Sequence, residues 1–265
     1  MARPDREVRR WTFDRHAELY DRGRPPYPDA IFEDLFALTG LPAGAAVLEI
    51  GCGPGRASRR LAAKGCRLTC LELGPHMAEV ARRNLAAFPD VQVVTGAFEA
   101  WDPRDARFDM VFAASSWHWL DPDTRFTKAA RVLRPGAFLA MLGASHAFPP
   151  DFDPFFTEIQ ACYRDLGEAR SAWPPPPPEQ GPDRRAEIEG SGLFTVIDIK
   201  RYLWAVDYSA DAYIAELNTH SGHIVWPEWK RDRLHEEIRR LVALRPGGRI
   251  RKHYLSLLHV SRRRP

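Results

Sequence analysis

Short apolar runs alternate with amphipathic segments through the middle of the chain. Five apolar runs have the length and composition of buried strands: residues 46–50, 68–73, 91–94, 110–113 and 138–142. Three segments between them have apolar residues at helical spacing: residues 57–64, 76–88 and 124–133. Because strands and helices alternate, the pattern predicts a parallel sheet with right-handed crossovers and helices on both faces.

The flanking segments have different patterns. Residues 11–40 are helical in pattern with a break at 24–28, and residues 196–206 and 253–260 alternate like strands around a strong helix at 227–244. We therefore expect an α/β, Rossmann-like, doubly wound sheet of seven strands with the last strand antiparallel. The expected parts are an N-terminal helical cap or lid, a core, an insertion rich in proline and aromatic residues, and C-terminal strands and helices that complete the sheet: residues 1–40, 41–145, 146–192 and 193–265.

Composition narrows the class of protein. The chain has 265 residues, 45% of them hydrophobic and 28% charged, with a net charge of +3, which is typical of a soluble globular protein. No apolar run is long enough to cross a bilayer, and the first ten residues lack the apolar centre of a secretory signal. The four cysteines form no CxxC pair. We expect a cytoplasmic protein with reduced cysteines, no structural zinc and no membrane partner.

A glycine loop follows the first buried strand. The string LEIGCGPG at residues 48–55 gives the spacing G-x-G-x-G, and Arg56 occupies the place of the third glycine of a dinucleotide motif. Glu49 brings a carboxylate beside any ligand of the loop, where it would repel a pyrophosphate. It would suit a ligand with an ammonium group and a positive sulfur, as in S-adenosylmethionine. A hydride-transferring dinucleotide enzyme is therefore disfavoured.

A second carboxylate follows the next strand. Glu72 lies 23 residues after Glu49, at the carboxyl end of the neighbouring strand. A carboxylate at that position can accept two hydrogen bonds from ribose hydroxyls.

These motifs resemble those of the class I S-adenosylmethionine-dependent methyltransferases, and more narrowly their small-molecule branch that includes trans-aconitate-methyltransferase-like enzymes. The resemblance covers residues 45–142, and residues 13–28 resemble the N-terminal cap of this branch. The motifs that carry it are LEIGCGPG at 48–55, Glu72, VTGAFE at 94–99, FDMV at 108–111, ASSWHW at 114–119 and RVLRPG at 131–136.

The resemblance implies S-adenosylmethionine as cofactor and S-adenosylhomocysteine as product. Arg24 would lie near the cofactor carboxylate, Glu49 near its amino end and Glu72 on its ribose. Family members often have an aspartate where this chain has Ala97, which leaves Glu99 or the backbone for the adenine amino group. The full set of cofactor contacts that it implies is Tyr20, Arg24, Tyr27, Glu49, Gly51, Gly53, Gly55, Glu72, Leu73, Met77, Ala97, Phe98 and Ser115.

Two segments are candidates for the acceptor side. Residues 115–119 follow the fourth strand, where ligands bind in such sheets, and residues 218–223 resemble the loop over the acceptor pocket. A methyl group on a sulfonium is already activated, so the main task is to hold the nucleophile in line and exclude water. The candidate catalytic residues are His118 and His220, and the candidate substrate contacts are Trp117, Trp119 and His223.

The roles of the histidines stay open at this point. His118 is either a general base or a residue that lines the pocket, and His223 is a further candidate base. Solvated loop histidines are the alternative for His220 and His223. We expect the acceptor pocket between the two segments, with the insertion as its roof.

The sequence thus predicts a methyltransferase with a small, partly apolar metabolite as its acceptor and no metal. One alternative is an RNA methyltransferase that uses the basic segment at residues 245–265. That alternative is less favoured, because the chain lacks the Asn/Asp-Pro-Pro-Tyr/Phe motif of amino-group nucleic-acid methyltransferases. Another is a non-methylating protein that keeps S-adenosylmethionine as a structural or regulatory ligand.

Overall fold

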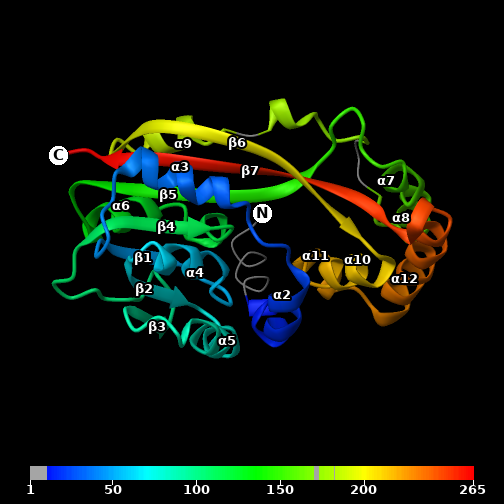
Figure 1. The fold of residues 1–265 in the computed structure, drawn as a ribbon, viewed down its shortest axis with the longest axis horizontal. Coiled ribbons are helices and arrows are strands. Elements are labelled where there is room, and N and C mark those ends of the chain that lie inside the picture. The colour runs from blue at the N-terminus through cyan, green and yellow to red at the C-terminus, as the bar shows by residue number, and fades with distance from the viewer. Residues whose placement is uncertain (1–10, 170–172, 182) are drawn as a thin grey trace.

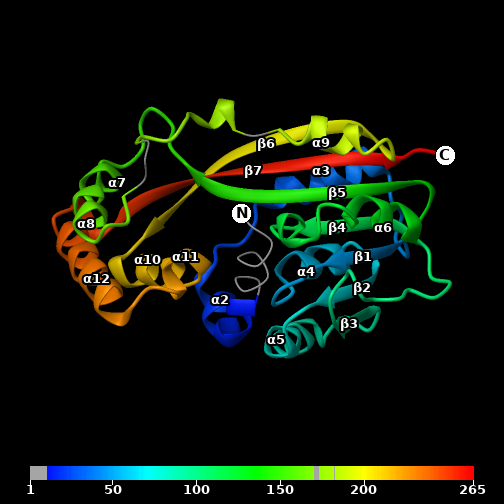
Figure 2. The same ribbon diagram turned by 180° about the vertical axis from the view of Figure 1, so that it is seen from behind.

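The protein is built on one seven-stranded sheet with strand order β3-β2-β1-β4-β5-β7-β6 (Figures 1 and 2). The computed structural model describes residues 11–169, 173–181 and 183–265. The strands are β1 (Ala46–Ile50), β2 (Arg67–Glu72), β3 (Val91–Thr95), β4 (Phe108–Ala114), β5 (Leu133–Ala147), β6 (Phe194–Tyr208) and β7 (Ile250–Arg263).

Strands β1 to β5 are parallel, and the final strand is not. β7 runs antiparallel to both of its neighbours, β5 and β6. The prediction of an antiparallel last strand is therefore confirmed. Because β7 lies between two long strands, most of the basic C-terminal segment is built into the sheet.

Helices cover both faces of the sheet, which confirms the doubly wound α/β class. Side chains of β1 alternate, so that Val47 packs toward one layer and Leu48 toward the other. One layer contains α3 (Asp29–Thr39), α4 (Arg56–Ala63) and α5 (Pro75–Leu85). The other contains α6 (Arg125–Val132) and α9 (Arg185–Gly190).

A second lobe stands beyond one end of the sheet (Figure 1). Its helices are α7 (Phe155–Glu158), α8 (Gln160–Asp165), α10 (Ala210–Leu217), α11 (Ser221–Ile224) and α12 (Glu228–Ala243). Phe155 and Ile159 of the expected insertion share a buried cluster with Tyr213, Leu234 and Ile238. The insertion and the C-terminal third thus form a common core, while α9, within the expected insertion, packs on the sheet.

The cap lies between the sheet edge and this lobe. Its described part consists of a short 3-10 turn, η1 (Asp14–His16), and α2 (Ala17–Gly23), and the rest of the expected 1–40 unit includes α3 on the sheet. Residues 1–10 of the expected cap lie outside the described residues. Asp14 accepts the Met77 N–H at 2.9 Å and bonds to His76 Nδ1 at 2.8 Å, so η1 is tied to the first turn of α5.

None of the helices in the part of the chain that the structure describes is long and apolar enough to cross a membrane. Within the same residues, no cluster of three or more His, Cys, Asp or Glu side chains could hold a metal ion.

Candidate functional site

The glycine loop turns sharply after β1. Gly51 has a φ of 65° and Gly55 a φ of 86°, a region that other residues rarely adopt. A Cβ atom at Gly51 would lie 2.7 Å from Ser116 Cβ, and one at Gly55 would lie 2.9 Å from Leu85 Cδ1. A Cβ at Gly53 would meet nothing within 4 Å. Packing therefore requires glycine at positions 51 and 55, whereas Gly53 leaves open space in front of the backbone.

Glu72 joins this loop to the neighbouring strand. One carboxylate oxygen accepts the Gly53 N–H at 2.8 Å, and the other accepts the Gly74 N–H at 3.1 Å. Burial raises the pKa of Glu72, and these backbone hydrogen bonds oppose that shift. The Leu73 backbone N–H lowers the pKa of Glu72 in the same way, and the carboxylate still has acceptor capacity for a further donor.

Glu49 is an unusual buried carboxyl group. It is fully buried, and among the described residues its Oε1 has no partner within hydrogen-bond distance, while Oε2 lies 4.0 Å from Cys70 Sγ. Burial raises the pKa of Glu49 to about 8. The Ser58 hydroxyl acts to lower the pKa of Glu49 and Glu72 acts to raise it. A cation beside Oε1 would remove the cost of burying this charge, so the residue fits a ligand with an ammonium group.

A small apolar cavity of about 70 Å³ opens where β1 and β2 end. Its walls are Ile50, Gly51, Leu71, Leu73, Gly96, Phe98, Ser116, Trp119 and Leu120. It brings Gly51, Leu73 and Phe98 of the predicted cofactor set together. Ala97 does not line it, and Met77 packs instead with Ala17 and Val80 beneath the cap.

A large cavity of about 870 Å³ lies between the sheet edge, the cap and the second lobe. Such a volume is typical of a small-molecule site. The predicted site residues that line it are Tyr20, Arg24, Tyr27, Ser115, His118, Trp119, His220 and His223. Its walls also include residues that the sequence did not single out, among them Tyr163, Trp204, Lys252 and Tyr254.

The cap closes over the end of β4 through two hydroxyl groups. The Tyr27 and Ser115 hydroxyl oxygens are 2.9 Å apart, and Ser115 has a φ of 55°. Burial raises the pKa of Tyr27 to about 12, so the phenol stays protonated at neutral pH. A non-glycine residue in this conformation is strained, and strain of this kind occurs at ligand sites.

His118 belongs to η2 (Trp117–Trp119) and faces the large cavity. The His118 side chain is exposed toward the cavity, and partial desolvation there lowers its pKa to about 4, with a further contribution from Arg184 and Arg125. The ring packs against Trp119 with 4.7 Å between the ring centroids. At neutral pH it is therefore an uncharged imidazole on the cavity wall.

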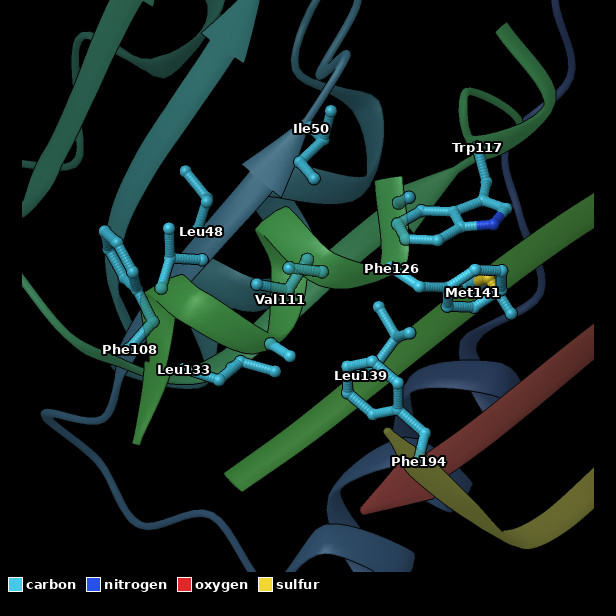
Figure 3. Packing of buried hydrophobic residues seen from close by; sticks show 14 of the residues in the cluster. Leu48, Ile50, Phe108, Val111, Trp117, Phe126, Leu133, Leu139, Met141 and Phe194 are labelled. Carbon is cyan, nitrogen blue, oxygen red and sulfur yellow. The ribbon is translucent and has the colours of Figure 1, made fainter. Parts of the chain in front are cut away.

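Trp117 lies elsewhere. Its ring is buried among Phe126 and Met141 in the core beneath the sheet, and it lines neither cavity (Figure 3). The 3-10 turn is the reason, because successive side chains point about 120° apart in such a turn. Trp117 faces inward while His118 and Trp119 face the cavity, so the predicted contact between Trp117 and the substrate has no support in the geometry.

The two histidines near α11 are both held by the protein. His220 Nε2 lies 2.8 Å from Glu216 Oε1, and His223 Nε2 lies 3.0 Å from the Tyr163 hydroxyl. Burial lowers the pKa of both rings, that of His223 to about 4. These contacts argue against freely solvated histidines, while 36% of the His220 side chain remains exposed.

Comparison with known proteins identifies the class. Residues 47–136 match the methyltransferase domain family. An uncharacterized methyltransferase of Mycobacterium tuberculosis is 29% identical over 237 residues, which are 89% of this chain and 87% of the relative. A malonyl-[acyl-carrier protein] O-methyltransferase of Enterobacter lignolyticus is 39% identical over 130 residues, 49% of this chain and 44% of the relative.

A solved structure shares the fold over nearly the whole chain. The putative type II methyltransferase of Anaeromyxobacter dehalogenans has a TM-score of 0.61 and 23% identity, with 90% of this chain and 97% of that one covered. The domain match and the relatives support a methyltransferase. The sheet order and the solved structure agree with a Rossmann-like methyltransferase fold.

Proposed function

We propose that this enzyme binds S-adenosylmethionine at the glycine loop and transfers its methyl group to a small, planar, partly apolar acceptor in the large cavity. One observation carries the proposal. The cavity of about 870 Å³ includes Arg56, which directly follows the glycine loop, and Ser115, whose neighbour Ser116 packs against Gly51. It continues into the aromatic second lobe. Cofactor and acceptor could therefore meet at the tip of β4.

Two charged groups of the chain fit the amino-acid end of this cofactor. Within the residues that the structure describes, Glu49 offers a carboxylate oxygen without a hydrogen-bond partner, and Arg24 offers a guanidinium whose Nε has none. Glu72 and the open backbone at Gly53 would hold the ribose, and the apolar cavity beside Phe98 would take the edge of the adenine. When bound, S-adenosylmethionine supplies an electrophilic methyl group on a sulfonium.

The remaining walls favour an uncharged acceptor. Aromatic side chains dominate the part of the cavity within the second lobe, including Phe148, Phe156, Trp173, Trp204, Tyr213 and Tyr254. Apart from Arg24, which we assign to the cofactor, the cations of the described cavity wall are engaged by the chain. Arg56 donates to the Asp21 carbonyl at 2.7 Å, and Lys252 pairs with Glu216 at 2.8 Å. The chain's own residues thus exclude water and pack against a flat ring.

The basic C-terminal segment gives little support to the RNA alternative. Arg245 pairs with Glu158 at 2.9 Å, Arg251 lies 3.7 Å from Asp207, and Arg262 packs over the Phe138 ring. These cations stabilise the sheet and the second lobe. A protein that binds nucleic acid needs cations that remain available for phosphates.

Release of S-adenosylhomocysteine tests the proposal. Purified protein with S-adenosylmethionine should release it only when an acceptor is present, and planar hydroxylated or amino-substituted aromatic compounds should be the best acceptors. Binding of the cofactor without turnover on any member of such a panel would favour the non-methylating alternative. Turnover on RNA that falls steeply with salt would favour the RNA alternative.

Proton release on binding is the first expected consequence. With its pKa raised to about 8, Glu49 is mostly protonated at pH 7 in the free protein, and a bound ammonium group favours the ionised form. Binding of S-adenosylhomocysteine should then release close to one proton, and affinity should rise with pH until about 8. Calorimetry in buffers of different ionisation enthalpy measures this release.

Glu49→Gln is the matched control, since it keeps the shape of the side chain and has no proton to lose. The variant should bind more weakly and release no proton from this position. Equal proton release by wild type and variant would show that Glu49 does not contact the amino group.

Ordering of the cap is the second expected consequence. S-adenosylhomocysteine should slow amide hydrogen exchange in residues 11–28, because Tyr20, Arg24 and Tyr27 would gain a ligand beneath them. Gly74→Ala should weaken this response. A Cβ atom there would lie 2.3 Å from Asp14 Oδ1, so Asp14 would lose its hold on α5.

Gly143→Ala in β5 is the control for that variant, because a Cβ there meets nothing within 4 Å. If S-adenosylhomocysteine does not change the rate of amide hydrogen exchange in residues 11–28 of the wild-type protein, the segment is not a lid.

A further inference from the structure

We propose that His220 is a positioning residue for the cofactor and not the base of the reaction: together with Glu216 it holds Arg24 toward the cofactor carboxylate. This inference rests on the proposed binding of S-adenosylmethionine. It assigns His220 a different role from the catalytic one that the sequence suggested.

The hydrogen bonds of His220 fix its tautomer. Arg24 Nη2 lies 3.1 Å from His220 Nδ1, and a guanidinium can only donate, so Nδ1 is the acceptor. The ring proton of the neutral imidazole is therefore on Nε2, which donates to Glu216 Oε1 at 2.8 Å. Both ring nitrogens are engaged, and no lone pair remains for a proton from the acceptor.

Glu216 is the buried anchor of the contact between His220 and Arg24. It is fully buried on α10, and its second oxygen accepts a hydrogen bond from Lys252 of β7 at 2.8 Å. Burial acts to raise the pKa of Glu216, but Lys252, His220 and Arg24 outweigh it and hold the pKa well below its usual range. The carboxylate is therefore ionised and fixed in place by partners from separate segments.

Arg24 depends on this anchor because its other contacts with the described residues are long or weak. Its Nη1 is 4.0 Å from Glu216, its contact with the Thr219 carbonyl is 3.4 Å long, and it packs over the Tyr20 ring. The bond to His220 is the shortest of these contacts. Without the imidazole, the flexible arginine would lose its fixed direction into the cavity.

The backbone brings the partners together. Gly23, the last residue of α2, lies so close to α10 that a Cβ would come within 2.8 Å of the Ala215 carbonyl oxygen and of Thr219 Cγ2. The cap residue Arg24 follows at once and is thereby placed beside Glu216 and His220. Glu216 and His220 of the second lobe thus support Arg24 of the cap. Lys252 of β7, which binds Glu216, also lines the cavity.

The experiment compares two ligands that differ in the amino-acid end. S-adenosylhomocysteine carries the carboxylate, and 5′-methylthioadenosine lacks it. His220→Ala should weaken binding of the first about tenfold, on the scale of a hydrogen bond to a charged group, and leave binding of the second unchanged. Calorimetry gives both affinities, and thermal unfolding of each variant shows that it is folded.

His220→Gln is the rescue variant, because an amide can accept from Arg24 and donate to Glu216 at once. It should restore the affinity for S-adenosylhomocysteine and retain turnover with an unchanged pH profile. The double variant Arg24→Ala, His220→Ala should lose no more affinity than Arg24→Ala alone, since both act through the same contact.

Three outcomes overturn the inference and leave the proposed function standing. They are an equal loss of both ligands in His220→Ala, no loss of either, and a His220→Gln enzyme that binds normally but turns over at least a hundredfold more slowly. The last would make His220 the base. If wild type binds neither ligand, the proposed function itself fails.

Discussion

Glu72→Ala should weaken binding of S-adenosylhomocysteine by about 1.5–3 kcal/mol, a factor of about 10 to 150 in affinity. The carboxylate stands at the carboxyl end of β2 and already accepts the N–H groups of Gly53 and Gly74. Two ribose hydroxyls would donate to the carboxylate oxygens of Glu72. In the variant, water would have to accept these hydrogen bonds in place of the carboxylate. Calorimetry with the purified enzyme measures the loss.

The design separates ribose contacts from loop structure. Glu79→Ala, an exposed acid on α5, is the surface control and should bind like wild type. Thermal unfolding without ligand reports how far the loop itself depends on Glu72, because the variant also loses two backbone hydrogen bonds. Undiminished affinity in a folded Glu72→Ala enzyme, or equal binding of NAD by wild type, would remove the basis of the cofactor assignment.

The first strands of the sheet were predictable within one residue. β1 coincides with the expected 46–50, and β2 is shifted by one residue from 68–73. Parallel strands buried on both faces consist of continuous apolar residues, and such runs are recognisable in one sequence. β5 extends from residue 133 to 147, well beyond the expected 138–142. Its outer part carries Ser145 and His146 toward the second lobe, where no apolar run marks it.

The glycine loop and the buried network differ in what the sequence could reveal. Gly51 and Gly55 need a conformation and a close approach that few residues allow, so their spacing is informative. Glu216 occupies a short helix where an acid is ordinarily solvated, and its partner Lys252 is 36 residues away. Nothing in a single sequence pairs such residues, because the long strands β6 and β7 bring them together.

The cluster at residues 117–119 illustrates the same limit at short range. The sequence of three consecutive aromatic side chains, Trp117, His118 and Trp119, does not indicate which of them faces the core. The direction of each ring depends on the 3-10 turn after β4, which the strand pattern does not encode. The structure resolves the ambiguity, with Trp117 in the core and His118 and Trp119 on the cavity wall.

His118→Ala should raise the KM for the acceptor about 10- to 100-fold and reduce kcat by less than about tenfold. The pKa of His118 is lowered to about 4, first by desolvation and then by Arg184 and Arg125, and no carboxylate contributes to this shift. An imidazole with so low a pKa is a poor general base, because the proton would have to leave an acceptor group whose pKa is far higher. Its neutral ring can still accept a hydrogen bond and orient the nucleophile.

The pH profile supplies the independent test of that role. Because the neutral form of His118 persists down to about pH 4, acceptor binding should be insensitive to its protonation between pH 6 and 9. His118→Gln should keep much of the wild-type KM, since its amide oxygen can replace the ring nitrogen as acceptor. A fall in kcat of about 10² to 10⁴ for His118→Ala, with KM unchanged, would instead assign proton transfer to this imidazole.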